Sequence, residues 1–259
     1  MKELKITLRY FLNSLQMQLA NMPAFVMFFI SKLLRYGMFM AFLFLLVSGL
    51  KNIGGYTREQ MLLFYLVFNI IDTLAQMLFR EVYRFRPLII SGNFDLVLMK
   101  PVNPLVRSLL GGPDFIDLGI LFILVAVAGY VISTQIHPSP SNEVIFLLMI
   151  FNSLIIASTF HIFVLAIGIL TLSVDHLVMI YRDLTSLMRI PVDIFTDPLR
   201  SVLTFVVPVG IMFTFPAKVL FGLLSWQLVI VSLIIGMGGF VLSIKFWHFA
   251  LKHYQSAGS

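Results

Sequence analysis

The chain has 259 residues, of which 59% are hydrophobic and 12% charged, and it contains no cysteine. Soluble domains carry about 25% charged residues, so this composition argues against a water-soluble fold. The lack of cysteine excludes disulfides, thiolate catalysis and Cys-ligated metal. The formal net charge of +6 does not indicate nucleic-acid binding, because the basic residues flank apolar runs, where they orient a chain in a membrane.

Apolar runs of about 20 residues are long enough to cross a bilayer. We therefore expect an all-α integral membrane protein that forms one transmembrane domain over residues 1–259. Apolar residues at helical spacing predict an interfacial elbow helix over residues 1–22. In the last span, Gly236, Gly238 and Gly239 would let another helix approach closely. The clear spans are predicted at 23–50, 61–79, 115–133, 144–170 and 226–250.

Lysine and arginine residues assign the two sides of the membrane. They precede the first span, fill the connection 80–114 and close the chain, so we place these three regions and both termini in the cytoplasm. The connection 135–143 has no Lys or Arg and is placed outside. Two cytoplasmic termini require an even number of spans, which predicts six transmembrane helices.

The stretch 172–222 allows two interpretations of the fifth span. Hydropathy alone favours a span over 202–223 with a charged cytoplasmic loop before it. The alternative is a polar span over 173–190, followed by a re-entrant outer hairpin over 191–222. Four prolines in that hairpin favour broken helices, which a membrane permits only where protein or a cavity covers the freed backbone groups. The charged residues that would then face protein or water are Asp175, Arg182, Asp183 and Arg189.

The connection 80–114 is basic but too apolar for a solvated linker. Short amphipathic pieces flank Gly92 and Asn93, two residue types suited to positive backbone dihedrals. These pieces need a covering surface, either anionic lipid headgroups or a partner protein. On a partner, we expect Phe94 and Leu96 to be buried. The candidate contact residues are Arg86, Gly92, Asn93, Phe94, Asp95, Leu96, Lys100 and Pro101.

Ionisable residues within spans are costly and are therefore functional candidates. Asn69 precedes Asp72 by three residues, so both share a helix face, which we expect to face the bundle. An interhelical hydrogen bond is an alternative role for Asp72. We expect Asp117 to be hydrated near the inner interface, and Lys32 and Arg35 to extend toward that interface. The candidates for a translocation path or for polar helix contacts are Asn69, Asp72, Asp175, Arg182 and Asp183.

Three stretches resemble a bacterial permease family within the type-2 ATP-binding-cassette (ABC-2) exporters. ISGNFDLVLMKPVNPL is similar to the family's signature after the second span, PVDIFTDPLRSVLTFVVPVGIMFTFPAKVLFG to its region before the last span, and FWHFALKHYQSAG to its C-terminal end. The resemblance implies two permease subunits, identical or paralogous, and two cytoplasmic ABC ATPase subunits that dock on the connection. It also implies the bacterial inner (plasma) membrane, and it favours the polar fifth span with the re-entrant hairpin.

The function expected is ATP-driven export of an amphipathic substrate such as a drug, an antibiotic or a lipid. The chain has no GxxxxGK[ST] motif to cradle phosphate and no HExxH, so we expect no catalytic, cofactor-binding or metal-binding residues on it. ATP and Mg are expected on the partner ATPase, and His161 is expected to be packed and hydrogen-bonded. Two alternatives are a proton-coupled secondary transporter, which would use the intramembrane carboxylates, and a membrane scaffold that anchors a cytoplasmic complex.

Overall fold

The computed structural model describes residues 12–13, 15–16, 22–48, 54–172 and 174–255. Within these residues all regular structure is helical, which confirms the all-α membrane fold. The elbow helix predicted over 1–22 lies mostly outside the described residues. Five helices are long and apolar enough to cross a membrane: α2(Met22–Ser48), α3(Arg58–Leu78), α7(Ile116–Val131) with its π-helical extension η2(Ile132–Ile136), α8(Pro140–Thr171) and α12(Trp226–Lys252).

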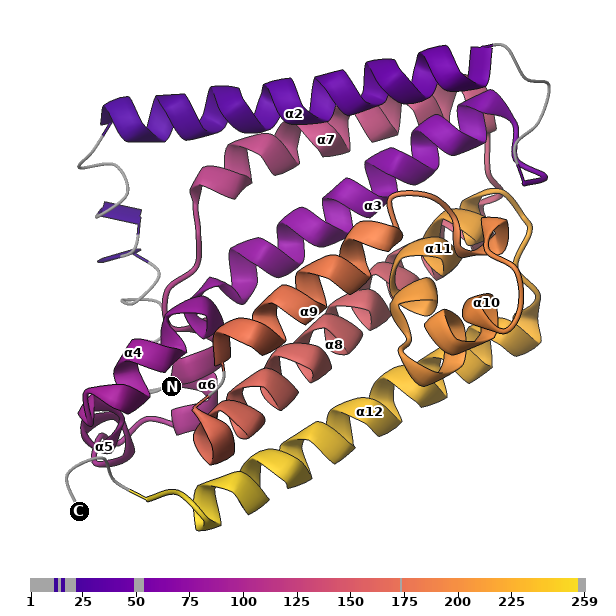
Figure 1. The fold of residues 1–259 in the computed structure, drawn as a ribbon. Helices are drawn as coiled ribbons and strands as arrows, with labels where there is room; N and C mark the ends of the chain where they lie inside the picture. Colours follow the sequence, from indigo (N-terminus) through magenta and orange to yellow (C-terminus); the bar gives the residue numbers. More distant parts are fainter. Residues whose placement is uncertain (1–11, 14, 17–21, 49–53, 173, 256–259) are drawn as a thin grey trace.

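These helices form a bundle in which α2, α3, α7 and α8 run in alternate directions and α12 runs in the same direction as α8 (Figure 1). We call the end that holds residues 80–114 and the end of α12 the basic end, and the opposite end, which holds residues 191–222, the hairpin end. Helix α9(Val174–Leu187) also runs along the bundle, between these two ends and beside α8 (Figure 1). Its start is fixed at the basic end by an ion pair of 2.7 Å between Asp175 and Arg86. The chain beyond it is fixed at the hairpin end, where Asp193 bonds Tyr56.

Side-chain caps begin three of the long helices at the hairpin end. Thr57 and Gln60 form a reciprocal capping box at α3, with Gln60 N–H donating to Thr57 Oγ1 (3.3 Å) and Thr57 N–H donating to Gln60 Oε1 (2.9 Å). The N-cap serines of α8 and α12 are Ser139 and Ser225. Each cap satisfies helix N–H groups that would otherwise have no partner near the membrane.

Helix α8 lies at the centre of the bundle, against α12, α11 and α9. The contact with α12 is close because Gly236 has no side chain: a Cβ atom there would lie 2.1 Å from Asn152 Oδ1. At Gly239 a Cβ would lie 3.4 Å from Thr159 Cγ2, whereas at Gly238 nothing lies within 4 Å. The predicted close approach is therefore confirmed at Gly236, whereas the contact with α8 does not require glycine at Gly238 or Gly239. Helical spacing explains the result at Gly238, which points away from α8.

The segment 191–222 is broken into short pieces, as its prolines predict. Their axes bend by 91° between residues 199–206 and 209–220, so no straight span covers 202–223. Polar side chains satisfy backbone groups freed by the breaks: Ser153 donates to the carbonyl oxygen of Met212 at 2.6 Å, and Thr214 accepts the N–H of Val192 at 3.0 Å. The pieces are η3(Val192–Ile194), α10(Leu199–Ser201), η4(Val202–Val206) and α11(Val209–Leu220).

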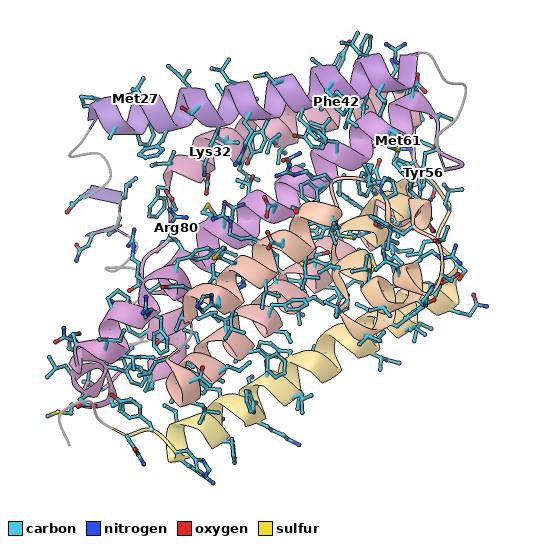
Figure 2. The ribbon with its side chains drawn as sticks, in the orientation of Figure 1. Met27, Lys32, Phe42, Tyr56, Met61 and Arg80 are labelled. Carbon is cyan, nitrogen blue, oxygen red and sulfur yellow. The ribbon has the colours of Figure 1, made fainter. Side chains whose placement is uncertain are left out.

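A polar clamp holds this segment to the start of α3. Tyr56, which lies just before α3 (Figure 2), donates from its Oη to Asp193 Oδ2 at 2.5 Å, and Lys218 Nζ donates to Asp193 Oδ1 at 2.9 Å. Burial, followed by the hydrogen bond to Asp193 and the charge of that residue, raises the pKa of Tyr56 above its usual range. Tyr56 therefore remains a hydrogen-bond donor at neutral pH.

Candidate functional site

A polar cavity of about 710 Å³ opens between α2, α3 and α9. Asn69 and Asp72 line it from α3, and Arg182 and Asp183 line it from α9. Four of the five predicted path residues therefore meet in one place. Asp175 is the exception, because it lies at the basic end in its ion pair with Arg86.

The two polar residues of α3 bond within their own helix. The amide nitrogen of Asn69 donates to the carbonyl oxygen of Tyr65 at 2.6 Å, and Gln76 donates to Asp72 Oδ2 at 2.7 Å. The prediction that Asp72 faces the bundle is confirmed by its place in the cavity lining. Its described hydrogen bond lies within α3, so no described contact supports the alternative of an interhelical bond.

Three arginines line the same cavity: Arg35 from α2, Arg182 from α9 and Arg189 just beyond α9. Arg35 Nη2 donates to Tyr36 Oη at 3.1 Å, and Arg189 Cζ lies 5.8 Å from the centre of the Phe39 ring. The expectation that Arg35 extends to the interface is wrong, since its side chain lines the cavity instead. Hydropathy alone did not reveal this, because the charged residues that share the cavity with Arg35 lie in α3 and in or just beyond α9, which are remote from it in the sequence.

A buried ion pair joins α2 and α7 near the cavity. Lys32 points into the bundle (Figure 2), where its ammonium group pairs with Asp117. The Asp117 side chain is only 2% exposed, so the expectation that it is hydrated is wrong, as is the expectation that Lys32 extends to the interface. The reason is that each residue supplies the opposite charge that the other needs when it is removed from water.

His161 packs beside the cavity wall, as the sequence predicts. Its Nδ1 atom lies 2.7 Å from the carbonyl oxygen of Ala157, and its ring centre lies 4.6 Å from that of Tyr181 and 4.9 Å from that of Phe79. In the part of the chain that the structure describes, no three His, Cys, Asp or Glu side chains are grouped to hold a metal ion.

At the basic end, the connection 80–114 folds into four short helices. Gly92 has a φ of +70° and separates the second from the third, as predicted. The same prediction is wrong for Asn93, which begins a helix and donates from its side chain to Ser91 Oγ at 2.8 Å. The four helices are η1(Arg80–Arg84), α4(Phe85–Ile90), α5(Asn93–Leu98) and α6(Pro104–Leu110).

An aromatic cluster anchors this connection to α12. The Phe94 ring centre lies 5.2 Å from that of Phe85, 6.4 Å from that of Trp247 and 5.2 Å from that of Tyr254. Phe94 is fully buried (0% exposed), so the expectation that it is buried against a partner is wrong. Its apolar surface is covered by the chain itself, through aromatic residues more than 150 positions away that local sequence cannot pair with it.

The outer surface of the connection carries the other contact candidates. Leu96 is 55% exposed and Met99 is 80% exposed. Leu96, Asn93 and Lys100 line a groove of about 280 Å³. The remaining candidates are placed as follows: Arg86 and Pro101 are exposed, and Asp95 is half-buried.

Ion pairs link the elements of the connection to one another. Arg107 Nη1 lies 2.6 Å from Glu81 Oε1, and Arg84 Nη1 lies 3.7 Å from Glu81 Oε2. Arg80, the first residue of η1 (Figure 2), lies 3.7 Å from Asp114, which precedes α7. These pairs tie the first and last helices of the connection together.

Long apolar helices that border an open cavity with charged residues, with a structured connection at one end, define a polytopic membrane protein. The family model described as ABC-2 family transporter protein matches residues 10–258. The chain belongs to this family, and it is a membrane permease subunit of an ABC transporter. No curated protein and no solved structure gives a significant match to the chain.

Proposed function

We propose that this chain is the permease of an ATP-driven exporter that moves an amphipathic substrate out across the bacterial inner membrane. ATP hydrolysis would take place on separate ATPase subunits that dock on the connection 80–114. The observation that carries this proposal is that the connection combines an ion-paired frame with two exposed apolar side chains, Leu96 and Met99. Exposed apolar side chains on a short structured element are typical of a docking surface.

The proposed topology places the basic end and both termini in the cytoplasm. Its support is the excess of Lys and Arg at that end, since such residues favour the cytoplasmic side. In this topology α9 is the fifth span and residues 191–222 form the outer re-entrant hairpin. Arg182 and Asp183 are exposed on α9, and charged side chains at membrane depth are stable only when protein or water faces them. Water in the cavity would face these two side chains, and a second permease, identical or paralogous, would close the open side of the cavity.

Transport would follow from movement of the connection. The Phe94 cluster links the connection to α12, and the pair between Arg86 and Asp175 links it to α9. A motor that displaces the connection would therefore move α9, which lines the cavity, and α12, which begins at the hairpin end. Alternate opening of the cavity to the two sides is the expected result.

The test replaces the exposed apolar side chains of the connection and leaves the Phe94 cluster unchanged. Leu96→Ala with Met99→Ala should reduce the amount of ATPase retained on the purified permease at least tenfold, because full burial of each side chain stabilises a contact by about 1.5 to 3 kcal/mol. The matched control is Leu199→Ala with Leu223→Ala, which changes two exposed apolar residues at the hairpin end. Equal ATPase retention and equal substrate-stimulated ATP hydrolysis in both double variants would overturn the proposed docking surface.

A further inference from the structure

We propose that the cavity selects anionic amphipaths, whose acidic headgroup is held by Arg35, Arg182 and Arg189. This inference rests on the proposed function, because it names the substrate class of the proposed exporter. It concerns a different surface from the ATPase contact, so the two proposals can fail separately.

The first argument is the charge balance of the cavity. Its lining carries three guanidinium groups and two carboxylates, those of Asp72 and Asp183, which leaves an excess of one positive charge. Among the residues that the structure describes, none of these five groups lies within ion-pair distance of an opposite charge. The absence of ion pairs is specific to the cavity, because Lys32 of α2 does pair with Asp117 of α7.

The second argument is the chemistry of arginine. A carboxyl group can lose its charge by taking up a proton, whereas a guanidinium group stays charged at any accessible pH. Three guanidinium groups that share a cavity with only two carboxylates, none of them within ion-pair distance, leave an excess positive charge between membrane helices that a bound anion would offset. The planar fork of arginine also matches a carboxylate or a phosphate with two parallel hydrogen bonds.

The third argument is the apolar part of the same lining. Met38 is 72% exposed, Phe42 is 55% exposed and Met179 is 60% exposed, and all three border the cavity from α2 and α9. Methionine side chains adapt to apolar groups of different shapes. A ligand with an acidic head and an apolar tail would therefore use both parts of the lining, whereas a free inorganic anion would use only the arginines.

The test uses the full chain in phosphatidylcholine nanodiscs without ATPase, and three probes at constant ionic strength. The probes are dodecyl phosphate, dodecyltrimethylammonium and inorganic phosphate, measured by displacement of radiolabelled dodecyl phosphate. We expect dodecyl phosphate to bind at least tenfold more tightly than either of the others. Equal affinity for the cation would overturn the charge selectivity, and equal affinity for inorganic phosphate would overturn the amphipathic class.

Variants then locate the site. Arg35→Gln and Arg182→Gln should each lower the affinity for dodecyl phosphate about tenfold, as expected for loss of a charge-assisted hydrogen bond. Arg182→Lys, which keeps the positive charge but cannot form two parallel hydrogen bonds, should lower the affinity for dodecyl phosphate less. Arg200→Gln is the matched control, because Arg200 is exposed at the hairpin end and pairs with Asp197. Unchanged affinity in Arg182→Gln would overturn the assignment.

A stability measurement separates ligand binding from a structural role. Removing an arginine that has no acidic partner should leave the thermal midpoint of the empty protein unchanged or raise it, because binding groups are often kept at some expense of stability. A lowered midpoint together with loss of a permease dimer would show that a second copy holds these arginines, and it would overturn the proposal. Retention of the ATPase in these variants would leave the proposed function intact whatever the binding result.

Discussion

The connection at the basic end and the cavity between α2, α3 and α9 both carry several charged residues, but only the connection pairs them. Glu81 contacts Arg107 and Arg84, and Asp114 contacts Arg80. The arginines and aspartates of the cavity have no such partners among the described residues. The difference indicates that the charged residues at the basic end stabilise the fold, whereas those of the cavity are available to bind a molecule outside the chain.

The surroundings of the two regions make this contrast stronger. Exposed ion pairs contribute only about 0 to 1 kcal/mol each, and the pair between Glu81 and Arg107 contributes more because both side chains are half-buried. Charged side chains at membrane depth are far less tolerated. The connection therefore has paired charges where an unpaired charge would cost little free energy. The cavity has unpaired charges where the cost is high. A fold selected for stability alone would show the opposite arrangement.

The largest expected effect concerns the anchor of the connection. Phe94→Ala removes a fully buried ring from the cluster with Phe85 and Trp247, and such changes cost about 3 to 5 kcal/mol. The thermal midpoint of the purified permease, followed by the fluorescence of Trp247 and Trp226, should fall clearly. Leu96→Ala, two residues further on but exposed, should change the free energy of unfolding by less than about 0.5 kcal/mol. A similar midpoint in both variants would contradict the anchoring role of Phe94.

Sequence reasoning located the spans and the breaks but not the pairs that join them. The spans could be predicted because a bilayer requires long apolar helices, and the broken segment could be predicted because Pro208 and its neighbours cannot continue a helix. Phe94 was misassigned because an apolar residue in an exposed connection has the same local signature whether its cover is a partner or the chain's own Trp247. That choice depends on tertiary contacts, which local sequence does not record.

Only part of the cavity lining could be predicted from the sequence, because the rest depends on tertiary contacts. Asn69 and Asp72 share a helix face by spacing alone, and the charges of α9 indicated a polar environment. Arg35 and the pairing of Lys32 with Asp117 depend on which helices become neighbours. Periodicity gives the face of a helix that is polar, but not the helix that it will meet.

An intermediate effect is expected from Glu81→Gln, which breaks the ion pairs of the connection while keeping the shape of the side chain. The free energy of unfolding should fall by about 1 to 3 kcal/mol, because the half-buried Arg107 loses a charged acceptor. Chemical denaturation of the purified permease would measure this change. High salt should reduce the difference between variant and wild type only slightly, since partly buried pairs are screened less than exposed ones. A change below about 0.5 kcal/mol would remove the contrast between the connection and the cavity.

The smallest effect on stability is expected from Asp72→Asn, the matching acid-to-amide change in the cavity. Asp72 accepts one hydrogen bond, from Gln76 of its own helix, and asparagine can still accept it. We therefore expect the free energy of unfolding to change by less than about 0.5 kcal/mol. Binding should change instead: loss of one of the two cavity carboxylates raises the local positive potential, so the affinity for dodecyl phosphate should rise severalfold while that for inorganic phosphate stays weak. Measuring both variants in the same nanodiscs makes the comparison decisive, because a cavity that behaves like the connection would lose stability on Asp72→Asn and gain no affinity for the anion.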